Sequence, residues 1–140
     1  MIEILIATHA DLAKGVVSSA ELIMGPQEHI TTVGLYAEDG FDTFNQKVMD
    51  AVASIKNEDG VLALVDLFGG TPCNVTAANI NRPIDGEVPK CECISGVNLP
   101  MLIEALSMRE CMSLSELKEH CMSSAADGIK DIKAEFNFGN

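Results

Sequence analysis

The stretch VLALVDLFGGTP, residues 61–72, decides the fold class of this 140-residue chain. Its first five residues are all apolar and partly β-branched, which is typical of a strand buried in a parallel sheet. Asp66 ends that run, two glycines follow, and Thr71-Pro72 is typical of an N-cap followed by proline at the first helical position. The stretch therefore predicts a strand, a tight turn and the start of a helix.

Apolar and amphipathic stretches alternate in the same way along the whole chain, without repeats or low-complexity tracts. Four strands are predicted, at residues 2–8, 30–36, 61–66 and 91–95. Roughly 20 to 25 residues separate successive strands, which is long enough for a helical crossover between parallel strands. We therefore expect an α/β three-layer sandwich, with a central, mainly parallel sheet in the order 2-1-3-4 and helices on both faces.

Two helices are predicted from their apolar faces and their end residues. The first stops at Gly25-Pro26, and its apolar positions are Leu12, Val16, Ala20, Ile23 and Met24. The last begins at a capping box of Ser113 and Glu116 and is expected to pack back onto the sheet; its apolar positions are Leu114, Leu117, Cys121, Ala125, Ile129 and Ile132. We expect one domain over residues 1–133 and a tail over 134–140 that frays from residue 137.

The chain is strongly acidic, with 21 Asp and Glu against 9 Lys and Arg and a formal net charge of -12. Such a surface cannot replace the counterions along a nucleic acid, so we expect no nucleic-acid binding. It favours a protein partner with a basic docking face. The alternative, that the acidity only keeps the protein soluble, stays open.

The five cysteines, an odd number, fit neither a disulfide framework nor a four-ligand zinc site. They indicate a reducing compartment and therefore a cytoplasmic protein. The apolar run at residues 4–7 is too short for a signal peptide or a membrane span. Cys73 lies in the first turn of a predicted helix, which favours a reactive thiol, but a small buried residue is the preferred interpretation.

A candidate site follows from the expected strand order. In a doubly wound sheet, ligands bind at the carboxyl ends of the strands where the order reverses, here between the first and third strands. His9 and Asp66 leave these two strands and are expected to share one crevice. If Asp66 accepts a hydrogen bond from one ring nitrogen of His9, it fixes the tautomer and frees the other nitrogen to act as a nucleophile. A structural histidine and a carboxylate that only caps a helix are the alternatives.

Glycine-rich turns on either side of this crevice suggest an anion site. Gly69, Gly70 and Thr71 precede a helix, where backbone N–H groups and the helix dipole favour a phosphate; an ordinary tight turn is the alternative. Asn98 either donates to the phosphoryl oxygens, braces its loop or caps the next helix. No metal-ligand spacing joins His9, Asp66 and Cys73, so no metal is expected, and His29 and His120 are taken as surface residues without a role.

Three motifs together resemble a known family. They are Thr8-His9-Ala10, the stretch DLFGGTPCN at residues 66–74 and the stretch SGVNLPM at residues 95–101. In this order and spacing they resemble the mannose-family EIIA component of the bacterial sugar phosphotransferase system, from residue 2 to about residue 132.

The resemblance implies that the chain is a phosphotransferase with a phosphohistidine intermediate. His9 is expected to accept a phosphoryl group from the carrier protein HPr on Nε2 and to pass it to a histidine of the EIIB component. Asp66 would bond Nδ1, while Gly70, Thr71 and Asn98 would surround the phosphoryl group. The resemblance also implies a homodimer with an acidic, apolar docking surface for HPr, an indirect link to the membrane components EIIC and EIID, and no cofactor.

Two related functions remain open at this point. One is a regulatory EIIA-like protein, and the other is the phosphotransfer subunit of dihydroxyacetone kinase; both use the same phosphohistidine. Many family members carry an EIIB domain after the EIIA domain, so for this chain the acceptor is expected on a separate polypeptide. A flavodoxin-like cofactor binder is disfavoured, because the crevice loops hold almost no aromatic residues to stack a flavin. The sugar cannot be inferred, because the membrane components select it.

Overall fold

The computed structural model describes residues 1–137, which form four strands and six helices. The strands are β1 (Glu3–His9), β2 (Ile30–Leu35), β3 (Val61–Val65) and β4 (Cys91–Ile94). The helices are α1 (Leu12–Met24), α2 (Phe41–Ser54), α3 (Thr71–Ile80), α4 (Leu99–Met108), α5 (Leu114–Asp127) and α6 (Ile132–Glu135). None of these helices has the length and apolar character that a bilayer-crossing helix needs.

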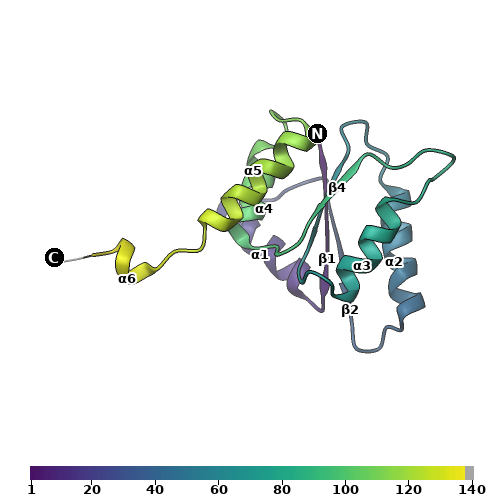
Figure 1. Cartoon of the computed structure of the whole chain (residues 1–140), viewed down its shortest axis with the longest axis horizontal. Helices are drawn as coiled ribbons and strands as arrows, with labels where there is room; N and C mark the ends of the chain where they lie inside the picture. The colour runs from purple at the N-terminus through teal and green to yellow at the C-terminus, as the bar shows by residue number, and fades with distance from the viewer. Residues whose placement is uncertain (138–140) are drawn as a thin grey trace.

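The four strands form one all-parallel sheet in the order β2-β1-β3-β4. Helices α1, α4 and α5 cover one face, and α2 and α3 cover the other (Figure 1). This confirms the predicted three-layer sandwich, and each strand lies within one residue of its predicted bounds. The sequence pattern was sufficient here because β1 and β3 are covered on both faces and read as nearly continuous apolar runs.

Alternate residues of the two central strands supply two separate cores. Ile4, Ile6, Leu62 and Leu64 face the layer of α1, α4 and α5. Leu5, Ala7, Ala63 and Val65 face the layer of α2 and α3. Successive side chains of a strand point to opposite faces, so β1 and β3 contribute to both cores. Packing on both faces fixes the register of the two strands, and their carboxyl ends lie side by side.

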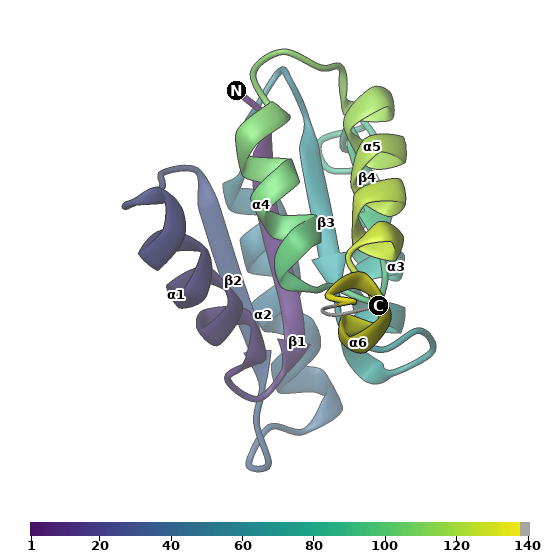
Figure 2. The same ribbon diagram turned by 90° about the vertical axis from the view of Figure 1, so that its left-hand side faces the viewer.

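The last predicted helix is wrong in its extent. α5 ends at Asp127, and Ile129 and Ile132 are 80% and 68% exposed instead of packed on the sheet. The 14 residues of α5 are about 21 Å long, whereas the strands β3 and β4 below it are only about 13 to 17 Å long. No sheet surface is left for the continuing apolar pattern, and the short α6 projects away from the body (Figure 1), toward the viewer in Figure 2.

The apolar face of α1 differs in part from the prediction. Its buried face consists of Ala13, Val16 and Ala20, while Leu12 and Ile23 are exposed. The domain boundary after residue 133, which lies within α6, stays a prediction. The predicted frayed end lies almost entirely at residues 138–140, outside the described residues.

Candidate functional site

His9 and Asp66 meet at the carboxyl edge of the sheet. His9 is the last residue of β1, and Asp66 follows β3, the strand paired with β1 in parallel register. The ring Nδ1 of His9 lies 2.8 Å from Oδ2 of Asp66, and the same oxygen accepts the main-chain N–H of His9 at 2.8 Å. The predicted convergence of two residues 57 positions apart is therefore what the structure has.

The carboxylate of Asp66 is held in its charged form. Partial burial alone would raise its pKa. Hydrogen bonds from the main chain and ring of His9, and one from Leu67 N–H to Oδ1 at 2.8 Å, outweigh burial and hold the pKa of Asp66 below its usual value. A charged carboxylate can only accept hydrogen bonds, so the proton of a neutral His9 ring must sit on Nδ1. Nε2 is then the ring nitrogen with a free lone pair.

The loop after Asp66 lies against the His9 ring. Gly69 has a φ of +81°, and a Cβ added at Gly70 would lie 3.1 Å from Cε1 of the His9 ring. A side chain at Gly70 would therefore press on the ring. Asn74, which the sequence analysis missed, braces this loop by donating its side-chain amide to Gly69 O at 3.1 Å. Only its position in the first turn of the helix could have suggested this role.

The N-terminus of α3 opens toward the same loop. The N-cap is Gly70 and not Thr71 as predicted, and Thr71 and Pro72 are the first helical residues. The N–H of Gly70 donates to Leu67 O at 3.0 Å, and Pro72 has no N–H. Because glycine has no side chain to cap with, the N–H groups of Thr71 and Cys73 are available to an anion. Gly70 thus lies next to the His9 ring at the start of α3, and Thr71 follows it. A phosphate-binding role for these two residues stays a prediction.

Asn98 is engaged in capping, one of the three roles considered for it. Its Oδ1 accepts the N–H of Met101 at 2.9 Å, and its Nδ2 donates to Ala125 O at 3.1 Å, which ties α4 to α5. The preceding loop also supports Asp66, because Gly96 N–H donates to Asp66 O at 2.9 Å. A direct contact of Asn98 with a phosphoryl group stays a prediction.

The remaining candidates lie apart from this arrangement. Cys73 is half-buried in the first turn of α3. His29 pairs with Glu3 at the opposite edge of the sheet, and His120 pairs with Glu104 between α5 and α4. Across residues 1–137, no three His, Cys, Asp or Glu side chains gather as metal ligands do.

Comparisons with known proteins find relatives that belong to one family. Residues 3–122 match a family model described as the fructose IIA component of the phosphotransferase system, of the EIIA-man type. The fructose-specific EIIA component of Bacillus subtilis is 36% identical over 84% of this chain and 77% of its own length. The mannose-specific EIIAB component of Escherichia coli is 33% identical over 96% of this chain, which spans 40% of that longer protein.

Solved structures show the same fold. A phosphotransferase system component EIIA from Streptococcus agalactiae superimposes with a TM-score of 0.84 at 31% identity, covering 96% of this chain and 99% of that one. A mannose/sorbose-specific IIA subunit from Enterococcus faecalis does so with a TM-score of 0.81 at 26% identity, covering 93% of each chain.

Proposed function

This chain belongs to the mannose-type EIIA family and is a component of sugar phosphotransfer, and from that premise we propose that Nε2 of His9 is the atom that carries the phosphoryl group. The observation that carries the proposal is the 2.8 Å contact between His9 Nδ1 and the carboxylate of Asp66. It leaves Nε2 unprotonated in the neutral ring, and an exposed imidazole with a free lone pair is a competent nucleophile.

In the proposed reaction, Nε2 attacks the phosphorus of a phosphohistidine on HPr. The new P–N bond forms as the P–N bond of the donor breaks, and the donor ring leaves with the electron pair. The His9 ring becomes positively charged, and Asp66 balances that charge from the Nδ1 side. A histidine of the EIIB component then attacks the same phosphorus in line, which returns His9 to its neutral form.

The anion cradle serves the phosphoryl group in both half-reactions. The N–H of Thr71, in the first turn of α3, would donate to its oxygens, and the positive end of the α3 dipole would stabilise its charge. Gly70, whose own N–H donates to Leu67 O at 3.0 Å, would line the site and leave room for the phosphoryl group beside His9. We assign the side-chain amide of Asn98 to the same site as a further donor, in addition to its observed role as the cap of α4. The chemistry needs positioning and charge stabilisation from the chain, and no metal or cofactor.

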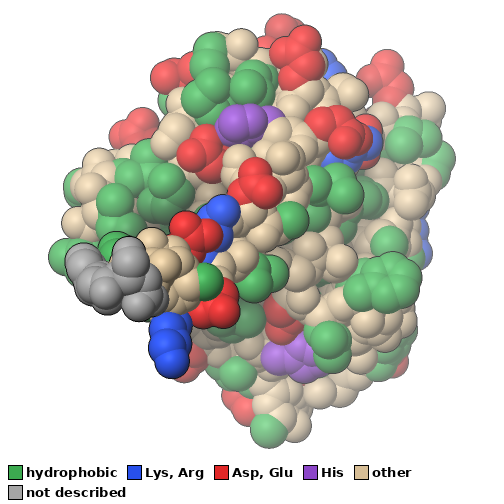
Figure 3. All heavy atoms as spheres, turned by 60° about the vertical axis from the view of Figure 1, so that its left-hand side comes forward, with side chains coloured by type: hydrophobic (Ala, Val, Ile, Leu, Met, Phe, Trp, Pro, Cys, Tyr) green, Lys and Arg blue, Asp and Glu red, His purple; other side chains and the backbone are tan. Residues whose placement is uncertain are grey.

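The surface around His9 supports docking of a basic protein. Leu67 and Phe68, which directly follow Asp66, are 63% and 84% exposed. The face shown in Figure 3 carries more acidic than basic side chains, in keeping with the net charge of -12. An exposed aromatic side chain close to His9 on an acidic protein suits a partner that combines apolar and basic groups. We accordingly propose HPr and the EIIB component as successive partners at this edge, with the membrane components EIIC and EIID involved indirectly.

The proposal includes two statements about context, a homodimer and a cytoplasmic location. Both rest on the family and on the charge and cysteine content of the chain. In the proposed scheme the phosphoryl donor is a phosphohistidine of HPr and the acceptor is a histidine of the EIIB component.

The direct test is to incubate the protein with labelled phosphoenolpyruvate, enzyme I and HPr. We expect one acid-labile, alkali-stable phosphate per chain, and peptide mapping should locate it at His9. Omitting HPr should remove the labelling. Labelling on another residue, or labelling that does not depend on HPr, would contradict the proposal.

A second step separates transport from the regulatory alternative. The phosphorylated protein is purified from HPr and mixed with an EIIB component of the mannose family. Loss of phosphate from His9 and its appearance on EIIB supports the carrier function. Phosphate that stays on His9 with every EIIB offered would favour a regulatory protein.

A further inference from the structure

The turn that follows His9 has a backbone conformation that its residue does not favour. Ala10 has a φ of +47°, in the left-handed region that alanine rarely adopts. His9 is the last residue of β1 and Asp11 is the N-cap of α1, so this one residue joins the strand to the helix. A conformation of this kind persists only where surrounding contacts hold it.

The contacts that hold the turn come from the end of β2. The N–H of Ala10 donates to Leu35 O at 2.7 Å. The hydroxyl of Tyr36 donates to Oδ1 of Asp11 at 2.6 Å. The turn is therefore fastened to β2 on both sides of the Ala10 Cα, by one main-chain bond and one side-chain bond.

Asp11 is the N-cap of α1, but its side chain bonds to Tyr36 and does not cap the helix. Residues at the N-cap normally accept a hydrogen bond from the first turn of the helix, but Asp11 makes no such bond. Thr8 replaces it, because its fully buried hydroxyl accepts the N–H of Ala13 at 2.8 Å. The carboxylate of Asp11 is thus committed to Tyr36.

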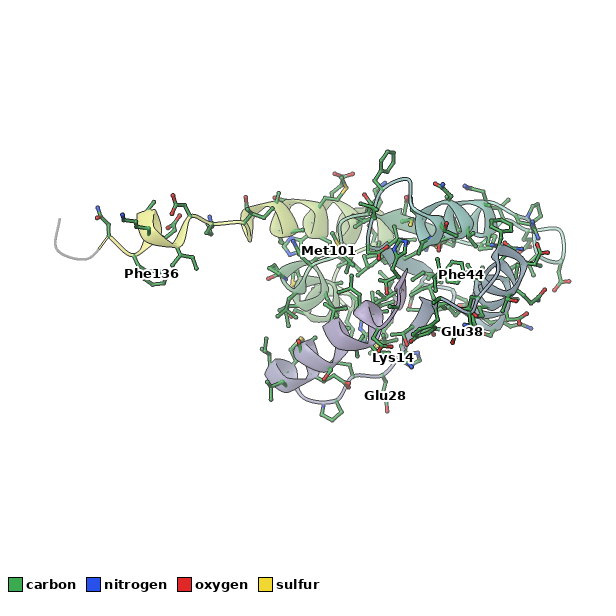
Figure 4. The ribbon with its side chains drawn as sticks, turned by 90° about the horizontal axis from the view of Figure 1, so that it is seen from below. Lys14, Glu28, Glu38, Phe44, Met101 and Phe136 are labelled. Carbon is green, nitrogen blue, oxygen red and sulfur yellow. The ribbon has the colours of Figure 1, made fainter. Side chains whose placement is uncertain are left out.

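Tyr36 is itself firmly placed. Its main-chain N–H donates to Asp39 Oδ2 at 2.9 Å, and Asp39 is paired with Lys47 at 2.8 Å. The ammonium groups of Lys14 and Lys47 lie 5.9 and 5.3 Å from the centre of its ring. Figure 4 looks onto this edge of the sheet from below, with Lys14 of α1 and Glu38 of the loop after β2 labelled there.

Gly34 explains how β2 comes so close to the turn. A Cβ at Gly34 would lie 2.7 Å from Ala10 O and 2.8 Å from the Tyr36 ring. Such contacts are too short for real atoms, so any larger residue would push the turn and the tyrosine apart. Gly34, Ala10 and Tyr36 therefore pack closely together, and a change in one of them would displace the other two.

We propose that Tyr36, acting through Asp11, is a positioning residue that holds the turn after His9 and thereby aims the His9 ring at the phosphoryl group. The inference rests on the proposed function of His9. His9 is then held from two sides, by Asp66 at the end of β3 and by the Tyr36–Asp11 bond at the end of β2. Asp66 orients the ring, and Tyr36 holds the backbone that carries it.

The test compares Tyr36→Phe, Asp11→Ala, the double variant and Asp11→Asn in transfer from phosphorylated HPr. Loss of the Tyr36 hydroxyl should lower the maximal rate about three- to tenfold, as expected for one hydrogen bond that aligns a reactant. The KM for phosphorylated HPr should not change in Tyr36→Phe. The double variant should have the same maximal rate as the slower single variant. Asp11→Asn keeps an oxygen acceptor and should restore most of the rate.

Ser113→Ala is the matched control for stability. It removes the capping box at the start of α5, at the far edge of the sheet, and should destabilise the fold without slowing transfer. A wild-type maximal rate in Tyr36→Phe, additive losses in the double variant, or an equal loss in Ser113→Ala would overturn the proposal.

Hydrogen exchange separates this inference from the proposed function. The Ala10 amide should exchange at least about threefold faster in Tyr36→Phe than in the wild type, because its bond to Leu35 depends on the held turn. If the wild type takes up no phosphate, the proposed function fails, and the exchange of Ala10 still decides whether Tyr36 holds the turn. Unchanged exchange in Tyr36→Phe contradicts the inference whatever the phosphate assay gives.

Discussion

The two edges of the sheet each carry a histidine paired with a carboxylate, and the pairs are closely alike. At the carboxyl edge, His9 Nδ1 lies 2.8 Å from Asp66, with 47% of the His9 side chain and 12% of the Asp66 side chain exposed. At the amino edge, His29 Nδ1 lies 3.2 Å from Glu3, with 53% and 11% exposed. Exposure and pairing therefore do not distinguish a phosphoryl site from a structural contact.

The difference lies in what surrounds each pair. At the carboxyl edge, α1, α3 and α4 begin, and glycines with positive φ precede α3 and α4 at residues 69 and 96. At the amino edge these helices end. There the buried guanidinium of Arg109 donates to the carbonyl oxygens of Ile2, Glu28 and His29.

Helix direction thus decides which pair can hold an anion. In a parallel α/β sheet, helix N-termini with free N–H groups gather at the carboxyl edge, and helix C-termini with free carbonyls gather at the amino edge. Arg109, the cation that contacts the main chain of His29, is already bonded to main-chain oxygens. The following predictions test this contrast, beginning with the largest expected effect.

Replacing His9 should abolish phosphate labelling, whereas replacing His29 should leave it almost unchanged. His9→Ala is expected to abolish acid-labile labelling by HPr, because it removes the nucleophile. His29→Ala should keep the labelling within about twofold of the wild type, since its pair lies at the edge without helix N-termini. Both are measured in the same labelling assay, with circular dichroism as the check on folding. Labelling that survives in His9→Ala would remove the basis of the contrast.

Replacing the carboxylate of Asp66 should slow phosphoryl transfer, whereas replacing that of Glu3 should not. Asp66→Ala is expected to keep the fold and slow phosphoryl transfer about a hundredfold or more, as loss of an orienting charge does. Glu3→Gln, the matched change at the amino edge, should leave the transfer rate within about twofold. The two rates come from rapid-quench single-turnover kinetics. Full-rate transfer in Asp66→Ala would exclude that residue from the mechanism.

Arg109 should matter for stability and not for transfer. Arg109→Met keeps much of the apolar volume but removes the guanidinium donor from the carbonyl oxygens of Ile2, Glu28 and His29, of which His29 O still accepts the N–H of Ile4. We expect the free energy of unfolding to fall by about 2 to 4 kcal/mol, because these wholly or partly buried hydrogen bonds are lost. Urea unfolding measures this, and the labelling assay on the folded variant is the control. A variant as stable as the wild type would show that the amino edge tolerates free carbonyls.

The smallest expected effect is on the free energy of unfolding at acidic pH, which should fall more in the wild type than in Asp66→Asn. The pKa of Asp66 is lowered in the folded protein, so its charge contributes stability that is present above its unfolded pKa of about 4. That contribution should be lost as the pH falls through the lowered pKa. Urea unfolding between pH 6 and 2.5 should therefore show the wild type losing stability relative to Asp66→Asn. A constant difference across this range would mean that the pKa of Asp66 is not shifted.

Local sequence patterns were enough to determine the strands, the sheet class and the candidate pair of His9 and Asp66. A strand buried on both faces has to be apolar, and a polar residue at its end has to face the edge of the sheet, so 61–66 could be interpreted by itself. The glycine-rich turn before α3 likewise predicts a helix start, although its N-cap proved to be Gly70.

Tertiary structure alone decided where α5 ends, that Asn98 caps α4, and which residues bond to the turn after His9. Ile129 and Ile132 continue a helical pattern, but the sheet beneath them has ended. The Tyr36–Asp11 bond joins residues 25 positions apart on a strand and a helix start that are adjacent only after folding. Periodicity reports which face of one element is buried, whereas such contacts depend on how strands pair and where crossovers return, which no local stretch encodes.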